Sequence, residues 1–138
     1  MESSTAWDEL QNWHRICQLK FRYCYSIDDK RCNDFVDLFT DDAIIDYATR
    51  ETYRGRTEIQ GFIETHVTEF EQTTHTVLNP VIEIDGDSAT GKWYGIVFLQ
   101  SDGTTRFGQV RYDETYRRGD DGWKFASLKT ESRLYTEI

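Results

Sequence analysis

Apolar residues recur at intervals of three and four along the first part of the chain, which is the spacing of one face of an α-helix. One stripe consists of Leu10, Trp13, Cys17, Phe21 and Cys24, and a second row beside it consists of Ile16, Leu19 and Tyr23. The first stripe is predicted to face the core. An apolar surface this wide predicts a helix over residues 5–27 that is covered on two sides, by a sheet and by a cavity or a partner subunit.

Shorter segments of both kinds follow this helix. We expect a helix over residues 30–39, a strand over 43–47 that pairs with residues 52–54, and a helix over 57–70. Thr57 and Gln60 have the spacing of a capping box, which favours a helix start at that point. Asp28 or Asp29 could cap the helix that begins at residue 30, which would give these carboxylates a purely structural role.

The second half of the chain is rich in the β-branched and aromatic residues of β-strands. Three Asp-Gly pairs are strong hairpin signals, at Asp85-Gly86, Asp102-Gly103 and Asp121-Gly122. They divide four predicted strands, over residues 73–84, 88–101, 104–118 and 123–135. Gly91, Gly95 and Gly108 fall inside these strands, where glycine commonly marks a bulge or bend that lets a sheet curl.

The order of these elements predicts a fold class. Helices first and a curled antiparallel meander afterwards indicate an α+β fold, with one sheet packed against two or three helices. A bent sheet that helices close only in part leaves a pocket between the two layers. With a single proline and no linker-like stretch, residues 1–138 are predicted to form one domain.

The charge excludes one class of partner. The formal net charge is −9, from 25 acidic and 16 basic residues, and lysine and arginine form no cluster. A surface of this sign repels phosphate backbones, so we expect no nucleic-acid partner. Salt adaptation and ordinary acidic solubility both explain the excess. The chain has no apolar run of the roughly 18 residues that span a membrane and no signal peptide at its start, so we expect a cytoplasmic protein without a membrane partner.

The cysteines and histidines give no sign of a metal site. Cys17, Cys24 and Cys32 are spaced by seven and eight residues, which matches no zinc or redox motif. Cys17 and Cys24 lie two turns apart on one helical stripe and are predicted to be small buried core residues. His75 has no second histidine at ligand spacing, and the chain has no phosphate-binding loop or nucleophile elbow. We therefore expect neither a metal nor a cofactor.

One histidine and one carboxylate are the strongest candidates for chemistry. His75 lies early in the first long strand, and Asp28 lies where the first helix ends. An imidazole that hydrogen-bonds to a buried carboxylate is fixed in one tautomer and can act as a general base or acid near neutral pH. An exposed strand histidine and a capping aspartate are the alternative that the sequence leaves open.

Three tyrosines surround this pair in the sequence: Tyr23, Tyr25 and Tyr47. A phenol in an apolar pocket can donate a hydrogen bond to a carbonyl or hydroxyl oxygen, although half-buried tyrosine is common in any core. On a continuous helix Tyr23 and Asp28 lie about 140° apart, so we expect the helix to end or turn between them if both face one cavity. His14 and His66 are predicted to be surface residues of their helices.

Several motifs, together with the order of elements, resemble the SnoaL-like family, whose members have the cone-shaped α+β barrel of nuclear-transport-factor-2-like proteins. The motifs are YCYSIDDKR, LFTDDAIIDY, TTHTVLNPVIEIDGDSATGKWY and YRRGDDGWKFASLK, and the resemblance covers residues 8–135. It implies a curved mixed or antiparallel sheet packed against three helices. This fold hosts many functions, so it does not by itself decide the function.

Within the family, the chain is most similar to small lyases of the bile-acid 7α-dehydratase and scytalone dehydratase type, and to hexachlorocyclohexane dehydrochlorinase. The catalytic dyad of these enzymes corresponds to Asp28 and His75. Tyr47 corresponds to a pocket tyrosine of the two dehydratases, and Tyr23 corresponds to a catalytic tyrosine of the bile-acid enzyme. The resemblance therefore implies Asp28, His75, Tyr23 and Tyr47 as catalytic residues.

Further matches and departures imply the rest of the pocket. The ATGKWY segment, which contains Trp93, is similar to the bile-acid enzyme, and Arg133 lies one residue from the position of a functional arginine in that enzyme. Leu99 replaces a second pocket histidine of the scytalone enzyme, and Val110 and Tyr112 replace its serine and asparagine donors. The pocket is therefore expected to be more apolar and to suit a polycyclic or terpenoid-like substrate.

These matches imply a cofactor-free lyase of the dehydratase type, or an isomerase, acting on a hydrophobic, cyclic small molecule. The alternative is a non-catalytic ligand-binding or assembly module, similar to the small subunit of ring-hydroxylating dioxygenases. Under either interpretation we expect a homodimer or homotrimer, because the apolar surface of the first helix and the outer face of the sheet both need cover.

Overall fold

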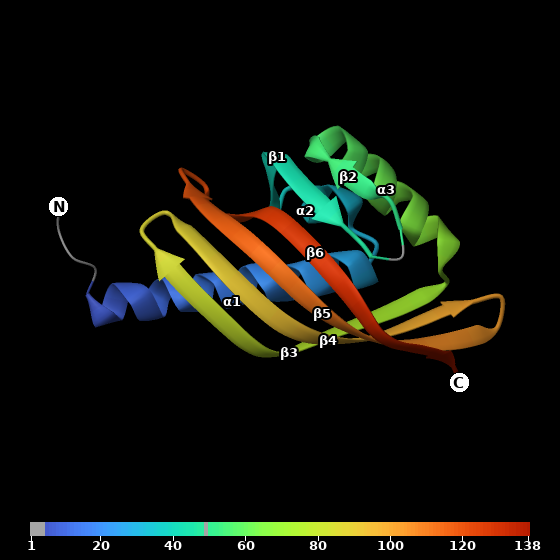
Figure 1. Cartoon of the computed structure of the whole chain (residues 1–138). Coiled ribbons are helices and arrows are strands. Elements are labelled where there is room, and N and C mark those ends of the chain that lie inside the picture. The colour runs from blue at the N-terminus through green and yellow to red at the C-terminus, as the bar shows by residue number, and fades with distance from the viewer. Residues whose placement is uncertain (1–4, 49) are drawn as a thin grey trace.

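The computed structural model describes residues 5–48 and 50–138, and its elements follow the predicted order of helices first and long strands afterwards (Figure 1). The helices are α1 (Ala6–Asp28), α2 (Cys32–Val36) and α3 (Gly55–Glu69), and the strands are β1 (Phe39–Asp46), β2 (Thr52–Arg54), β3 (Gln72–Asp85), β4 (Ser88–Ser101), β5 (Thr104–Gly119) and β6 (Gly122–Glu137). Within these two ranges no helix is long and apolar enough to cross a membrane.

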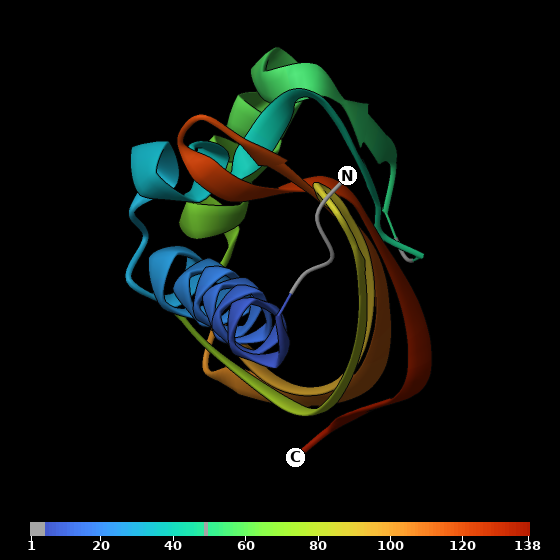
Figure 2. The ribbon, with the colours of Figure 1, turned by 90° about the vertical axis from the view of Figure 1, so that its left-hand side faces the viewer.

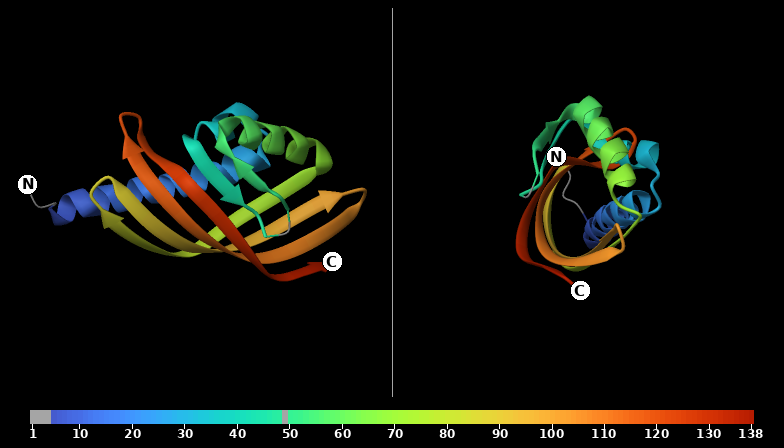
Figure 3. Two further views of the ribbon diagram at one scale, coloured as in Figure 1. Left: turned by 45° about the horizontal axis from the view of Figure 1, so that its top comes forward. Right: turned by 90° about the vertical axis from the view of Figure 1, so that its right-hand side faces the viewer.

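The strands form one mixed sheet in the order β2-β1-β6-β5-β4-β3. β1 and β6 run parallel, and the other neighbours run antiparallel. The sheet curls around α1, which lies along its concave side, while α2 and α3 lie near β1 (Figure 2 and Figure 3). The predicted cone-shaped α+β fold, with a curved sheet packed against three helices, is therefore confirmed.

The predicted long helix is present as α1, and it begins at a complete capping box. The Thr5 hydroxyl accepts a hydrogen bond from the backbone N–H of Asp8, and the Asp8 carboxylate accepts one from the N–H of Thr5. The row of Ile16, Leu19 and Tyr23 is buried in the core. This row belongs to the hydrophobic core, together with Cys17 and Cys24 of the stripe beside it.

The stripe predicted to face the core is only partly buried. Leu10, Trp13 and Phe21 are 55%, 40% and 37% exposed, whereas Cys17 and Cys24 are buried as predicted. The first turns of α1 extend beyond the strands (Figure 1), which leaves their apolar side chains open to solvent. The prediction was wrong for Leu10 and Trp13 because periodicity shows that a helix has an apolar face but not how far the sheet reaches along it. Phe21 lies further along α1 and packs on the Trp93 ring of β4 with one side, at 6.1 Å between centroids, while the rest of its side chain is exposed.

The two shorter helices start differently from the prediction. The N-cap residue of α2 is Arg31, and neither predicted aspartate caps this helix. α3 begins at Gly55, before the predicted capping box, and its N-cap residue Arg54 makes no side-chain cap hydrogen bond. Gly55 has a φ of 77°, a conformation that glycine adopts without steric strain, so β2 can lead directly into α3.

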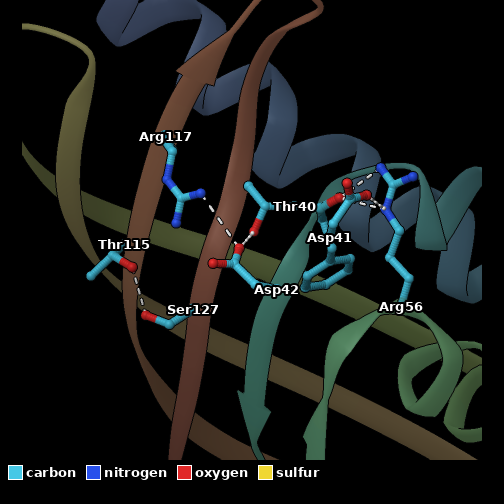
Figure 4. Close-up of polar contacts among 8 residues, drawn as sticks. Thr40, Asp41, Asp42, Arg56, Thr115, Arg117 and Ser127 are labelled. Atoms are coloured by element: carbon cyan, nitrogen blue, oxygen red, sulfur yellow. Dashed lines mark hydrogen bonds and ion pairs between the residues drawn. The ribbon is translucent and has the colours of Figure 1, made fainter.

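Arginine side chains hold the strand that leads to the predicted pocket tyrosine (Figure 4). Arg56 of α3 donates hydrogen bonds of 3.0 and 2.8 Å to the carbonyl oxygen of Phe39. Arg117 of β5 donates to the carboxylate of Asp42 at 3.4 Å. These contacts link β1 to α3 and to β5, and Tyr47 follows β1 directly in the chain.

The four long strands lie where the Asp-Gly pairs predict them, but one predicted source of curvature is different. The pairing of β3 with β4 shifts register between Leu78 and Val81, where Asn79 has a φ of 56° and Pro80 follows. The pairing of β4 with β5, in contrast, continues without a shift through both of the predicted glycine bends in β4. The bend of β3 therefore comes from Asn79-Pro80.

The two glycines of β4 serve a different purpose, which is to make room for aromatic rings. A Cβ atom built on Gly95 would lie 2.6 Å from the ring of Tyr112 and 2.9 Å from the side chain of Val110. A Cβ atom built on Gly91 would meet the ring of Tyr116 in the same way. Only a residue without a side chain allows these tyrosine rings to lie flat on the neighbouring strand.

A fully buried ion pair joins α1 to the sheet. Nζ of Lys20 lies 2.5 Å from Oε2 of Glu114, and both side chains are 0% exposed. The Tyr116 hydroxyl donates to Glu114 at 2.7 Å, and the indole N–H of Trp93 donates to the Tyr116 oxygen at 3.0 Å. Nζ of Lys20 also lies 3.4 Å from the centroid of the Tyr112 ring. The helical pattern did not predict a buried lysine at this position.

Candidate active site

Asp28 and His75 meet where the end of α1 packs against the start of β3. Oδ1 of Asp28 lies 2.6 Å from Nδ1 of His75, and Oδ2 accepts a 2.8 Å hydrogen bond from the backbone N–H of the same residue. The Thr73 hydroxyl donates to Oδ1 at 2.8 Å. The carboxylate is thus bound through both oxygens by one short segment of β3, and it caps no helix.

This contact determines which ring nitrogen of His75 carries the proton. Nδ1 lies against a carboxylate and therefore carries the proton that it donates, while Nε2 is left as the basic nitrogen. The side chains of His75 and Asp28 are mostly buried. Two hydrogen bonds from one residue to Asp28 fix the orientation of the imidazole ring before any ligand binds.

His75 lies in the wall of a cavity of about 650 Å³ between the sheet and α3. Its apolar and aromatic lining consists of Tyr23, Ile27, Tyr47, Phe62, Phe70, Val97, Leu99, Gly108, Val110, Tyr112 and Tyr135, and its polar lining consists of Arg50, His66, Glu69, His75, Ser101, Arg106, Thr130 and Ser132. This volume lies within the range of about 300–1,000 Å³ that is typical of small-molecule sites.

Two tyrosine hydroxyls contact each other in this wall. The hydroxyl oxygens of Tyr23 and Tyr47 are 2.7 Å apart, and either can be the donor. Burial raises the pKa of both phenols, so both are protonated at neutral pH. The ring of Tyr23 also lies 6.3 Å from the ring of His75, edge to face. One of the two hydroxyl protons is used between the tyrosines, and the other is available to a ligand.

α1 runs unbroken through Asp28, so the turn expected between Tyr23 and Asp28 is absent. The two residues nevertheless serve one site, because His75 lies between them. Tyr23 lines the cavity directly, whereas Asp28 reaches it only through the imidazole. Tyr25, the third predicted tyrosine, is exposed.

The predicted surface location of His66 was wrong. Its side chain is 6% exposed and lines the cavity, and within the described part of the chain neither ring nitrogen has a hydrogen-bond partner. Burial, and to a smaller extent interactions with the nearby His75 and Arg50, lower the pKa of His66 to about 3, so the ring is neutral at pH 7. Phe62 and Phe70 lie four residues before and after it in the chain, Phe62 within α3 and Phe70 directly after it, and this apolar spacing is the sequence signal that was missed.

The other predicted pocket residues divide into two groups. Leu99, Val110 and Tyr112 line the cavity. Trp93 does not line it. The Trp93 indole is buried and donates a hydrogen bond to Tyr116, which in turn donates to Glu114 of the Lys20–Glu114 ion pair. Arg133 is exposed. Val110 of β5 pairs with Ser132 and Gln109 pairs with Leu134, so Arg133 has no partner on β5 and falls in a bulge. The bulge brings Ser132, and not Arg133, to the cavity.

Charged residues also form part of the lining. Arg50 and Glu69 form an ion pair at 2.8 Å, and both line the cavity. Arg106 also lines it and pairs with Glu137 at 3.4 Å. Among the described residues, no group of three histidine, cysteine or acidic side chains is arranged to hold a metal ion. The lining therefore offers ion-paired charges and hydrogen-bond donors in addition to the His75 imidazole.

Comparison with known protein families agrees with the fold and with the motifs. The SnoaL-like domain matches residues 8–129, and the chain belongs to this family. A relative, the uncharacterized protein Rv2910c of Mycobacterium tuberculosis, is 29% identical over 134 residues, which cover 94% of this chain and 90% of the relative. The predicted family is thus confirmed.

Solved structures extend the similarity to proteins with named activities. A proposed scytalone dehydratase of Novosphingobium aromaticivorans has a TM-score of 0.88 at 21% identity, with 94% of this chain and 89% of that chain covered. A type 2 hexachlorocyclohexane dehydrochlorinase has a TM-score of 0.90 at 20% identity, with 97% and 93% covered. A proposed aromatic ring hydroxylase of Novosphingobium aromaticivorans has a TM-score of 0.89 at 21% identity, with 94% of each chain covered. At these identities the likeness is one of fold.

Proposed function

We propose that this protein is a cofactor-free lyase of the dehydratase type, or an isomerase, that acts on a hydrophobic cyclic small molecule. The single observation that carries the proposal is the contact between Asp28 and His75. It fixes the proton on Nδ1 and leaves Nε2 as a base in the wall of a largely apolar cavity. Names of structurally similar lyases support the same class of reaction.

The first step is removal of a proton from a carbon next to a carbonyl group. Nε2 of His75 takes the proton, the C–H electron pair forms an enolate, and Asp28 stabilises the imidazolium that results. A hydroxyl proton from the Tyr23–Tyr47 pair would bind the enolate oxygen, where negative charge develops. The phenols stay protonated at neutral pH, which this donor role requires.

The second step decides between elimination and isomerisation. If the substrate has a hydroxyl group on the neighbouring carbon, the enolate reforms the carbonyl, the C–O bond breaks, and the hydroxide leaves with a proton from the His75 imidazolium as water. If it has instead a carbon–carbon double bond between the β and γ carbons, proton removal gives a dienolate, the imidazolium returns the proton to the γ carbon, and the double bond moves into conjugation with the carbonyl group. Both routes use the same base and restore it.

The cavity supports a hydrophobic substrate with few polar groups. Leu99 and Val110 contribute apolar surface, and aromatic rings of Tyr112 and Phe62 add flat faces against which a ring system can pack. A fused-ring compound fits this combination of aromatic wall and volume.

A β-hydroxyketone with two fused rings tests the proposal. 3-Hydroxy-1-tetralone gives 1-naphthol when it loses water, and the product is detected by its fluorescence. We expect the wild type to accelerate this reaction and His75→Ala to reduce kcat/KM by about 10²–10⁴-fold, the usual contribution of a general base. Asp28→Asn should produce a loss in the same range, because an amide no longer fixes the imidazole tautomer or stabilises its charge.

A matched control and a second reaction make the test decisive. His14→Ala removes an exposed histidine of α1 and should leave the rate unchanged. Exchange of the α-protons of 1-tetralone in D₂O, followed by NMR, measures proton removal alone and needs no leaving group. If the wild type accelerates neither reaction, or if His75→Ala keeps the acceleration, a binding or assembly module becomes the better interpretation.

A further inference from the structure

Arg106 is a charged side chain of the cavity wall that the proposed reaction does not use. It lies on β5, where Arg106, Gly108 and Val110 alternate toward the cavity. Its side chain is 31% exposed, so the guanidinium is open to contact. Arginine keeps its charge at any physiological pH. The cavity of a protein whose net charge is −9 thus has a permanent cation in its wall.

The contacts of Arg106 within the protein are weak. Nη1 donates to the Ser101 hydroxyl and Nη2 to the Glu137 carboxylate, both at 3.4 Å, which is long for a hydrogen bond. Glu137 is 66% exposed and lies outside the lining, and an exposed ion pair of this kind contributes little. Arg50, the other arginine of the lining, is held at 2.8 Å by Glu69, which is itself a lining residue. Of the two arginines, Arg106 is therefore the one whose charge is open to a ligand.

The register of the sheet places Arg106 on the same face as the proposed base. His75 pairs with Val97, and Val97 pairs with Gly108, which is two residues from Arg106. With strands about 4.8 Å apart and a rise of about 3.4 Å per residue, the Cα atoms of His75 and Arg106 are at most about 12 Å apart along the sheet. Val97 and Leu99 line the cavity on the strand between them. A ligand can therefore place an apolar body against β4 while its two ends reach the imidazole and the guanidinium.

A guanidinium favours one kind of ligand group. It is planar and presents two N–H donors side by side, which matches the two oxygens of a carboxylate. Hydrogen bonds to an ionised acceptor are about twice as strong as those between neutral groups. A carboxamide has nearly the same shape but carries neither the negative charge nor the second acceptor oxygen. The pair of groups thus separates recognition of charge from recognition of shape.

We propose that Arg106 binds a carboxylate of the substrate, at the end of its ring system that lies away from the carbon on which His75 acts. The substrate class is thereby narrowed to cyclic ketones that carry an acid group. This inference deepens the proposed function and rests on it only for the placement of the reacting carbon at His75.

Binding of two unreactive probes, measured by isothermal titration calorimetry at pH 7, tests the inference apart from catalysis. 2-Naphthoate carries a carboxylate, and 2-naphthamide has nearly the same shape without the charge. We expect the wild type to bind 2-naphthoate about tenfold more tightly, because a charge-assisted hydrogen bond is the stronger one. Arg106→Gln keeps a polar side chain and should abolish this preference while still binding 2-naphthamide. Arg111→Gln is the matched control: Arg111 lies on the same strand, over the ring of Tyr94 and outside the lining, and its loss should keep the preference.

A second variant leaves the cavity lining intact. Glu137→Gln removes the exposed carboxylate that competes for Arg106, so it should tighten 2-naphthoate binding by up to about fivefold and leave 2-naphthamide binding unchanged. The inference is overturned if the wild type shows no preference for 2-naphthoate, if Arg106→Gln retains the preference, or if Glu137→Gln weakens 2-naphthoate binding. Because no turnover is measured, these outcomes are distinct from a failure of His75 to act as a base.

Discussion

Replacing Lys20 by methionine should destabilise the fold strongly, because it breaks the buried ion pair and keeps only one of its charges. Methionine has a similar length and fills the same space, so the change removes charge with little loss of packing. Glu114 would remain fully buried, with the Tyr116 hydroxyl at 2.7 Å as its remaining hydrogen-bond donor. An uncompensated buried carboxylate is unfavourable unless it takes up a proton.

The expected magnitude follows from the completeness of the burial. Removing one partner of a buried pair typically costs about 3–5 kcal/mol, and the bond that Tyr116 keeps places this case near 3 kcal/mol. For a chain of 138 residues, this corresponds to a fall in Tm of roughly 10 °C. The double variant Lys20→Met/Glu114→Gln removes both charges and should recover most of the loss, to within about 1.5 kcal/mol of the wild type.

The loss should also depend on pH. Burial raises the pKa of Glu114, and the positive charge of Lys20 opposes this rise in the wild type. Without Lys20 the folded-state pKa rises further above the unfolded value of about 4.3. A raised folded-state pKa contributes stability that is present below the unfolded pKa and is lost as the pH increases. Lys20→Met should therefore be more destabilised at pH 8 than at pH 5.

Urea unfolding followed by tryptophan fluorescence, at pH 5 and pH 8, measures the loss in Lys20→Met, its recovery in the double variant and its dependence on pH. Arg31→Met is the matched control, because the 3.6 Å pair of Arg31 with Asp34 is on the surface and should contribute less than about 1 kcal/mol. A loss below 1 kcal/mol for Lys20→Met, or a double variant as unstable as the single one, would refute this account of the ion pair.

Two further predictions concern the sheet and the tyrosine pair. Gly95→Ala should lower the free energy of unfolding in urea by about 1–3 kcal/mol, because the added Cβ meets the Tyr112 ring. Gly61→Ala, on the exposed face of α3, is the control and should raise the free energy of unfolding by up to about 1 kcal/mol. Equal effects of the two changes would contradict this account. Tyr47→Phe should lower kcat for 3-hydroxy-1-tetralone by about 10²-fold with little change in KM, as expected for loss of a transition-state donor. An increase in KM at unchanged kcat would instead assign the hydroxyl to substrate binding.

The sequence predicted the fold well because its strongest signals are local. Asp-Gly pairs divide four strands whose ends need no tertiary information, and the apolar spacing of α1 is long enough to leave no alternative to a helix. The pairing of Asp28 with His75 was identified as a candidate from residue type, position and family resemblance. The 2.6 Å contact required the structure, since 47 residues separate the two positions.

The errors share a physical cause, which is that side-chain environment depends on neighbours distant in sequence. Lys20 and His66 are polar residues among apolar ones, and only the packing of α1 and α3 against other elements makes them buried. Arg133 was misplaced because a bulge in β6 shifts the alternation of its side chains by one position. Trp93 was predicted to line the cavity, but the strand presents it to Tyr116.

The bend at Asn79-Pro80 affects more than the curvature of the sheet. β3 is the last strand in the sheet order, so its outer backbone edge is where another chain could add a strand. Figure 1 shows β3 running as two arms with a change of direction between them. Proline offers no N–H for pairing, and the positive φ of Asn79 interrupts the straight ladder that an added strand would need. The change of direction that lets the sheet wrap around its contents thus also protects this acidic protein against edge-to-edge aggregation.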